Sequence, residues 1–239
     1  MEIIKHITTL IIGFFFGCTA IMNAQIQAGV YISDSDNMRR ELKIDDDYMV
    51  YTEYRKSPPK FIRTLGGFPR VEEAAGERLV VLLEFNSNYE KDSLRMLSIP
   101  MDIDGKNLVL DWTSKMTFNP LGKKVQDLDS AWLFATRGPD EDEERRGAEN
   151  SRKTLKFLMD GRFQWIAYNT DTFEFFGTGG GSFSSQDGKY VENIDFFSRD
   201  DSRVGATLDF DYEIKDSDWH HTGKNSKGEP LYEVWARRE

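Results

Sequence analysis

The chain has 239 residues, of which 39% are apolar, and its 41 acidic against 31 basic side chains give a net charge of −10. This apolar content excludes wholesale disorder. The acidic balance argues against a nucleic-acid-binding function, because binding phosphates requires a basic face. The single cysteine, Cys18, excludes a disulfide framework and a zinc site built on several cysteines.

The first 24 residues have the pattern of an export signal. Lys5 precedes the apolar run 10–17, which is shorter than the roughly 20 residues that a bilayer-spanning helix needs. Met22-Asn23-Ala24 resembles a small-residue cleavage site. We therefore predict a cleaved signal peptide over residues 1–24 and a periplasmic or secreted protein with no transmembrane span. The alternative is a lipid anchor on Cys18.

The rest of the chain has the pattern of strands and turns. Leu208–Ile214 alternates apolar and acidic residues, as a half-buried strand does. The denser apolar run Leu79–Phe85 indicates a strand covered on both sides. The 13% aromatic content also favours strands. Turn dipeptides separate such runs at Asp104-Gly105, Asp187-Gly188 and Lys227-Gly228.

Four blocks recur in the same order, which indicates a duplicated β unit or, alternatively, coincidence between strand-rich segments. The blocks pair Glu41–Ile44 with Thr154–Phe157, Leu65–Gly67 with Thr178–Gly180, Leu83–Ser87 with Ile194–Ser198, and Asp111-Trp112 with Asp218-Trp219. The turn-rich segment 119–128 lies between the copies. We therefore predict two units, over residues 25–120 and 128–239. Within the second unit, the polar segment 137–150 connects a strand around Trp132 to one around Leu155, as an acidic loop or short helix.

The second unit resembles a lipocalin-like (calycin) domain of unknown function that occurs in exported bacterial proteins. The segments that carry the resemblance are Leu155-Lys156, Gly161–Tyr168, Gly179–Phe183, Tyr190–Ile194, Trp219–Gly223 and Glu233–Arg237. The resemblance implies a closed antiparallel β-barrel, usually around an apolar cavity, and it implies no agreed activity. The expected fold class is therefore all-β, with two tandem lipocalin-like antiparallel barrels.

The wider superfamily has a Gly-x-Trp opening strand whose Trp is covered by a basic residue of the last strand. Here Ser130-Ala131-Trp132 takes the opening position, and Arg237 is the matching basic residue. The first unit has Gly29-Val30-Tyr31, with Lys115 as the corresponding basic candidate. The resemblance thus implies barrel closure by Trp132 and Arg237.

Four motifs are better explained by structure than by chemistry. The glycines of 177–182 lack the Lys and the following helix of a phosphate-binding loop, so we predict a barrel corner or β-bulge. The neighbouring His220 and His221 point to opposite faces of a strand and cannot readily share a metal. The acids of 209–213 alternate with apolar residues and are expected to face solvent. The acidic run 140–144 lacks the spacing and glycine of a calcium loop. No metal site or cofactor is predicted.

The candidate site is a set of aromatic and polar side chains that strand parity directs to one barrel interior. Its members are Phe163, Trp165, Tyr168, Tyr190, Glu192, Phe210, Tyr212, Trp219, His221 and Trp235. They either fill the barrel or line a pocket. We therefore expect a non-enzymatic protein that binds a small apolar or amphipathic ligand. The alternatives are a solid-packed structural or protein-interaction module of the cell envelope, and a hydrolase or isomerase that uses His221 or Glu192.

Overall fold

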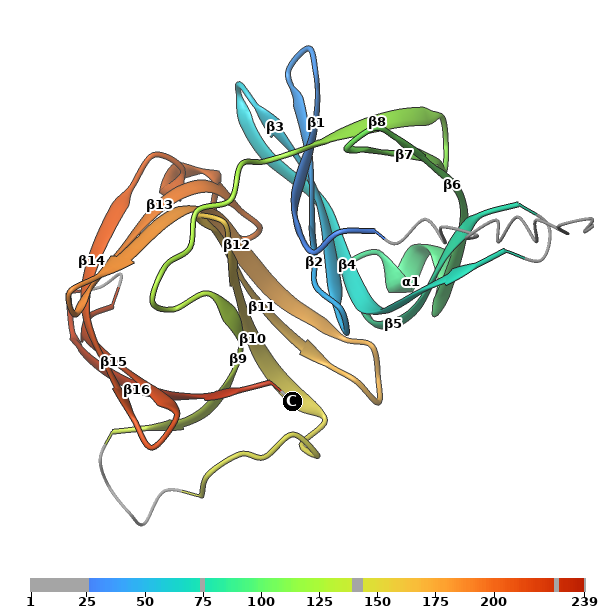
Figure 1. Cartoon of the computed structure of the whole chain (residues 1–239). Coiled ribbons are helices and arrows are strands. Elements are labelled where there is room, and N and C mark those ends of the chain that lie inside the picture. Colours follow the sequence, from blue (N-terminus) through green and yellow to red (C-terminus); the bar gives the residue numbers. More distant parts are fainter. Residues whose placement is uncertain (1–25, 74–75, 139–143, 226–227, 239) are drawn as a thin grey trace, which may run out of the picture.

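The computed structural model describes residues 26–73, 76–138, 144–225 and 228–238, and it is all-β (Figure 1). Two closed antiparallel barrels of eight strands each follow one another along the chain, which confirms the predicted fold class. The predicted signal peptide with Cys18, part of the acidic run 140–144, and Lys227 lie outside the described residues. In the described part of the chain, no helix has the length and hydrophobicity needed to cross a bilayer.

The first barrel pairs each strand with the next one along the chain and closes where β8 pairs with β1. Its strands are β1 (Gly29–Ser35), β2 (Met38–Ile44), β3 (Met49–Lys56), β4 (Pro59–Glu72), β5 (Arg78–Asn86), β6 (Met96–Asp104), β7 (Asn107–Asp111) and β8 (Lys115–Pro120). A single helical turn, α1 (Tyr89–Asp92), connects β5 to β6. The interior is filled by buried aliphatic and aromatic side chains, among them Leu42, Val81, Leu110 and Met116.

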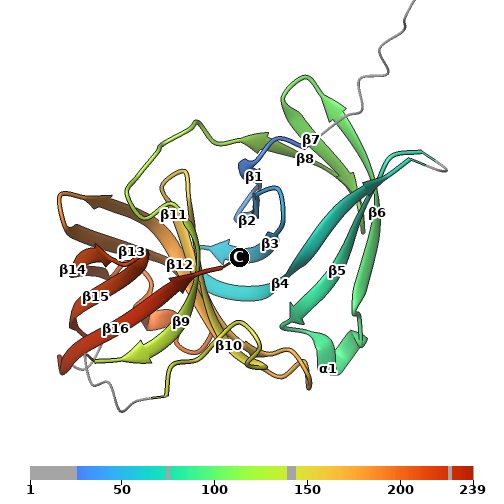
Figure 2. The same cartoon turned by 60° about the horizontal axis from the view of Figure 1, so that its bottom comes forward.

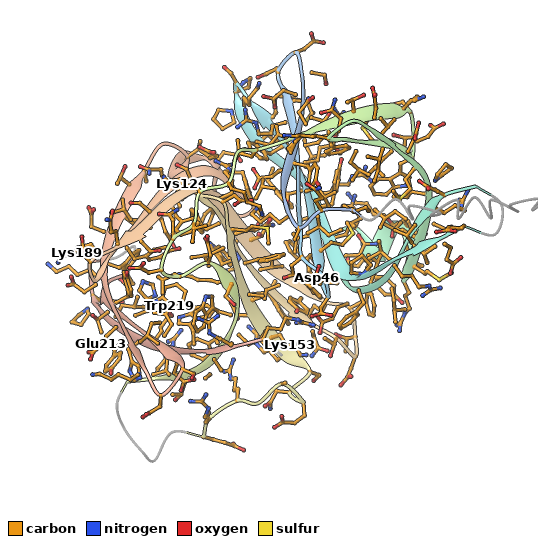
Figure 3. The ribbon with its side chains drawn as sticks, viewed as in Figure 1. Asp46, Lys124, Lys153, Lys189, Glu213 and Trp219 are labelled. Carbon is orange, nitrogen blue, oxygen red and sulfur yellow. The ribbon has the colours of Figure 1, made fainter. Side chains whose placement is uncertain are left out.

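The second barrel has the same strand order and closes where β16 pairs with β9. Its strands are β9 (Ser130–Arg137), β10 (Arg152–Met159), β11 (Arg162–Asn169), β12 (Phe175–Gln186), β13 (Lys189–Phe197), β14 (Thr207–Lys215), β15 (Asp218–Lys224) and β16 (Pro230–Arg237). A short 3-10 turn, η1 (Asp201–Arg203), lies between β13 and β14. Figure 3 shows Trp219 within the ring of strands, and Lys189 and Glu213 on its outer side.

Each barrel contains a β-bulge at a pair of glycines. The register of β4 against β5 shifts between Gly66 and Gly67, and that of β12 against β13 shifts between Gly180 and Gly181. A Cβ on Gly181 would lie 1.8 Å from the Asn193 carbonyl oxygen, closer than any real contact, so the backbones approach as only glycine allows. The predicted bulge is confirmed, and the glycine-rich stretch lies inside a strand.

Strand pairing corrects the alignment of the two units by one residue. Leu42 faces Tyr51 across β2 and β3, and Lys156 faces Trp165 across β10 and β11. Lys156 is therefore the counterpart of Leu42, whereas the sequence alignment assigned it to the neighbouring Lys43. A shift of one residue moves every side chain of a strand to the opposite face, so this register decides which residues point into the barrel.

The match of Asp111-Trp112 with Asp218-Trp219 was also wrong. Asp111 is the last residue of β7, whereas Asp218 is the first residue of β15, the corresponding strand. The counterpart of Trp219 is Leu108, because each faces an aromatic residue of the last strand. A short Asp-Trp pair carries too little information to fix a strand register.

The segment between the barrels closes one end of the second barrel. Leu128 is fully buried, and its carbonyl accepts a hydrogen bond of 2.9 Å from the Trp132 indole. The Leu128 N–H and the Gln126 side chain bond to Ser185 and Phe183, on β12. Figure 1 shows this segment turning from β8 across the opening before it enters β9. Any access to the interior is therefore from the opposite end.

The outer faces of the two barrels pack against each other through a mixed apolar and polar interface. The apolar part contains Tyr48, which precedes β3, and side chains of β3, β5 and β9 to β11: Val50, Phe85, Ala131, Leu133, Leu155, Phe157, Ile166 and Tyr168. Figure 2 shows the C-terminal end of the chain between the two barrels. There Arg238 contacts Glu84 at 3.0 Å. The interface therefore includes strands from both units and the chain end.

Two buried networks join the barrels. The carboxylate of Glu84 accepts hydrogen bonds from Tyr48 (2.6 Å), Tyr168 (2.8 Å) and Lys153 (3.0 Å). The amide of Gln164 accepts from Thr52 and donates to Thr64 and Thr178, at 2.7 to 3.1 Å. Because buried polar groups need partners, these bonds fix one relative placement of the two outer faces.

A third network centres on Arg162, at the start of β11. Its guanidinium contacts Glu41 at 2.8 Å and Asp195 at 2.7 Å, and donates to Tyr54 at 3.1 Å. Lys43 also pairs with Glu41, whose side chain is fully buried. Burial raises the pKa of Glu41, but the two cations outweigh it and hold the pKa at about 2. Glu41 is therefore ionised inside the interface at neutral pH.

Candidate functional site

The interior of the second barrel is an aromatic cluster that surrounds a buried ion pair. Lys156 Nζ lies 3.0 Å from Glu192 Oε1, and both side chains are less than 10% exposed. The same ammonium lies 4.9 to 5.9 Å from the ring centres of Tyr190, Phe210, Trp219 and Trp235. Negative ring faces stabilise a cation at such distances. The aromatic interior therefore holds a positive charge supplied by the chain itself.

Tyr190 completes this pair by donating a hydrogen bond of 2.8 Å to Glu192. Burial and the adjacent carboxylate raise the pKa of Tyr190 well above its ordinary value. The phenol therefore stays protonated and remains a donor. The ion pair has a fixed hydrogen-bonded geometry, which buried charges require.

His221 lies beside the ion pair and is 2% exposed. The centre of its ring lies 4.3 Å from the ring centre of Phe210 and 5.1 Å from that of Trp219. Its Nδ1 is 3.5 Å from the Glu233 carboxylate. Burial and the charge of Lys156 lower the pKa of His221 to about 4. The imidazole is therefore neutral at pH 7.

These four ionisable residues occupy positions that are apolar in the first barrel. According to the strand register, Lys156 is the counterpart of Leu42 in the first barrel, and Glu192 is the counterpart of Val81. The same registers assign His221 to Leu110 and Glu233 to Met116. The first barrel fills these four positions with apolar side chains, and its own charged cluster, Glu53 with Arg40 and Arg63, lies elsewhere, beside Tyr51. The charged groups therefore distinguish the second barrel from the first.

A cavity of about 430 Å³ opens at the end of the second barrel opposite the closing segment. The residues that line it are Phe134, Arg137, Arg146, Arg152, Thr154, Trp165, Ala167, Glu233 and Trp235. Ligand pockets typically measure 300 to 1,000 Å³ and combine aromatic walls with a few polar groups. A hollow of about 620 Å³ beside the start of β16 is lined by the end of β9, the start of β16 and the loops next to them, and Tyr232 is the one aromatic side chain in its lining.

The aromatic walls of the cavity are held by contacts between strands. Phe134 and Trp235 meet edge to face at 5.6 Å, and Trp165 meets Phe197 in the same way at 5.5 Å. The Trp235 indole donates a hydrogen bond of 3.2 Å to Glu233. The rings therefore present fixed surfaces to the opening.

In the first barrel the corresponding end is covered. Tyr51 is the counterpart of Trp165, and Trp112 packs against its ring at 5.5 Å. The Arg63 guanidinium lies 4.0 Å above Trp112. These side chains occupy the place that the cavity has in the second barrel.

The segment after residue 143 contributes part of the cavity rim. The backbone N–H of Arg146 donates to the Ala135 carbonyl at 2.9 Å, so the segment pairs with β9. Arg145 makes two hydrogen bonds, of 2.5 and 2.9 Å, to Asp218. These contacts place the Arg146 guanidinium 5.2 Å from the Phe134 ring. The described part of the predicted acidic loop, residues 144–150, is exposed and contains no helix.

Most of the predicted pocket residues share one interior, but only two of them line the cavity. Trp165 and Trp235 form its walls. The buried residues of the packed interior are Phe163, Tyr190, Glu192, Phe210, Trp219 and His221. Neither His221 nor Glu192 lines this cavity.

Two predicted residues have other roles. Tyr168 was wrongly placed in the pocket, because it points outward and is buried against the first barrel, where it donates to Glu84. Tyr212 packs against the interior cluster, and its hydroxyl donates to Asp127 of the closing segment. Alternation along a strand gives two faces, and both faces of β11 are buried here.

Sequence reasoning missed seven of the lining residues: Phe134, Arg137, Arg146, Arg152, Thr154, Ala167 and Glu233. Phe134 follows Trp132 by two positions on the predicted opening strand, so strand parity could have found it. Thr154 and Arg152 precede Lys156 on the same face of β10 in the same way. Arg146 belongs to a loop, for which no periodic signal exists.

In the second barrel the two predicted closure residues are in contact. The Arg237 guanidinium lies 4.6 Å from the Trp132 ring, and Trp132 is fully buried. The counterpart suggested for the first barrel was wrong, because β1 pairs Tyr31 with Pro120 and leaves Lys115 exposed at the other end of β8.

The remaining polar candidates lie on the outer surface. His220 shares a hydrogen bond of 2.8 Å with Tyr232, and Asp218 holds Arg145. Asp209, Asp211 and Glu213 are exposed, as their alternation predicted. Among the described residues, no group of three or more His, Cys, Asp or Glu side chains is placed to hold a metal ion.

The two closed eight-stranded antiparallel barrels fit a lipocalin-like fold. No protein-family model matches the chain, and a search of curated proteins found no match.

Proposed function

We propose that this chain is a lipocalin-like protein whose second barrel binds a small amphipathic molecule at its open end. The observation that carries the proposal is the cavity of about 430 Å³ between Phe134, Trp165 and Trp235. Apolar contact with fixed aromatic surfaces supplies affinity, and a few polar groups at the rim supply orientation. The contrast with the covered end of the first barrel supports a role specific to the second.

Tryptophan fluorescence provides a direct test, because two tryptophans form the walls. The neutral lipophilic probe N-phenyl-1-naphthylamine is expected to gain fluorescence on binding and to quench Trp165 and Trp235. Thr154→Trp fills the cavity from β10 and should abolish the effect. Thr117→Trp, on the exposed outer face of β8, is the matched control and should preserve it. Equal probe binding by both variants would refute a site in this cavity.

We also propose that residues 1–24 direct export and are removed. The apolar run 10–17 and the small-residue site before Gln25 support this proposal. Mass spectrometry of protein recovered from an expressing bacterium should give a chain that begins at Gln25. A chain that begins at an acylated Cys18 would instead establish the lipid anchor, and an intact Met1 would refute both.

A further inference from the structure

The cavity of the second barrel is positively lined on a chain with a negative net charge. Arg137, Arg146 and Arg152 line it together with one carboxylate, Glu233, whereas the chain as a whole carries −10. A cleft lined by one sign of charge between low-dielectric walls concentrates ions of the opposite sign. This opening therefore attracts anions.

The rim arginines lie next to aromatic rings. Arg146 and Arg137 lie 5.2 and 6.0 Å from the ring of Phe134, and Arg152 lies 3.8 Å from that of Phe176. A guanidinium that lies over a ring directs its N–H donors outward in its own plane, in a geometry that matches a carboxylate. Arg146 and Arg152 are exposed, so their N–H groups are accessible to a ligand.

Glu233 makes the inner end of the cavity negative, whereas the arginines make its rim positive. Burial raises its pKa, but His221 and the Lys156 charge outweigh burial and hold the pKa below its ordinary value, so the group is ionised at pH 7. Its carboxylate faces His221 in the barrel interior. An anionic group is therefore repelled from the inner end and attracted to the rim.

The flat walls restrict the shape of the rest of the ligand. Phe134 and Trp235 stand nearly perpendicular to one another, with an interplanar angle of 88°. A planar ring placed beside either of them gains stacked or edge-to-face contact. Beyond them the interior is filled by buried side chains such as Tyr190 and Trp219. A long flexible chain therefore has no continuation into the barrel.

We propose, on the basis of the ligand-binding function above, that the ligand is a planar aromatic carboxylate. Its ring system lies among Phe134, Trp165 and Trp235, and its carboxylate lies at the rim beside Arg146 and Arg152.

Three probes that share one ring system test this assignment. Calorimetry and Trp quenching are measured with naphthalene-2-carboxylate, 2-naphthylmethanol and 2-naphthylmethylammonium. The carboxylate should bind about tenfold more tightly than the alcohol, since several exposed cations each contribute modestly. The ammonium should bind most weakly. Raising the salt concentration should weaken binding of the carboxylate but not binding of the alcohol.

Charge variants identify the groups responsible. Arg146→Gln and Arg152→Gln should each weaken carboxylate binding by about two- to fivefold and leave the alcohol unchanged. Lys189→Gln removes one positive charge from the outer wall, where Lys189 pairs with Asp211. This variant should bind the carboxylate and the alcohol with unchanged affinity. Equal affinity for the three probes would overturn the anion assignment but leave the binding function intact. Failure of all three to bind would overturn both.

Discussion

The guanidinium of Arg237, on the last strand of the second barrel, lies 4.6 Å from the buried ring of Trp132, on its first strand. The two residues are direct partners in the β9–β16 register, and Arg237 also donates to Ser130 at 3.2 Å. The contact between Arg237 and Trp132 therefore joins the last strand to the first and also covers the tryptophan ring.

Truncation of Trp132 should lower the free energy of unfolding more than truncation of Arg237 does. Trp132→Ala removes a fully buried ring and should lower the free energy of unfolding by about 3–5 kcal/mol. Arg237→Ala removes an exposed cation over a ring, a loss of about 0.5–1 kcal/mol. Urea denaturation followed by circular dichroism measures both. Lys115→Ala, the mistaken counterpart, should stay within about 0.5 kcal/mol, and an equally stable Trp132→Ala protein would contradict the assignment.

The fold was predictable because its strands carry local signals. Alternation in Leu208–Ile214 and the glycines at the β12 bulge each follow from rules that act within a few residues. The register between the two units was not predictable to the residue. Leu42 and Lys43 both lie in an apolar context, and only pairing with β3 shows which of them is the counterpart of Lys156.

Strand parity shows which residues share a face, but it does not show which of two buried faces points into the barrel. Trp235 was placed correctly by parity along the last strand. Tyr168 was misplaced because the outer face of β11 is also buried, against a barrel whose placement no local pattern encodes. Arg146 reaches the cavity through the Arg145–Asp218 contact, between residues far apart in sequence.

The ion pair of Lys156 and Glu192 should be sensitive to the loss of either partner alone. Lys156→Leu, which introduces the residue of the first barrel, leaves a carboxylate that is 5% exposed with only the Tyr190 hydroxyl as partner. We expect a loss of about 3–5 kcal/mol in the free energy of unfolding. The double variant Lys156→Leu, Glu192→Val should recover most of it, since apolar replacement of a buried pair is often neutral. A double variant no more stable than the single one would show that the pair is required beyond charge balance.

The contact between the barrels should depend on Arg162. Arg162→Met removes its bonds to Glu41, Asp195 and Tyr54, and leaves Glu41 with Lys43. Loss of one partner from a buried network lowers the free energy of unfolding by about 3–5 kcal/mol. Lys189→Met breaks an exposed pair and should change stability by less than about 1 kcal/mol. We expect one calorimetric transition for the parent and two for Arg162→Met, and identical melting profiles would contradict the proposed role of Arg162.

The stability of the second barrel should decrease in mild acid because of His221. Its pKa is about 4 in the folded chain, against 6.5 for an unperturbed imidazole, so the unfolded chain takes up the proton first as the pH falls. The contribution is complete above pH 6.5 and is lost progressively below it, by about 2 kcal/mol between pH 7 and pH 5. Buried carboxylates with lowered pKa values, such as Glu41, lose their contribution in more acidic solution. Burial raises the pKa of Asp129 to about 6, so protonation of Asp129 stabilises the fold in the same pH range and opposes this loss. On going from pH 7 to pH 5, the parent and His220→Leu should therefore lose about 2 kcal/mol more stability than His221→Leu. An equal change in all three proteins would assign the effect to another group.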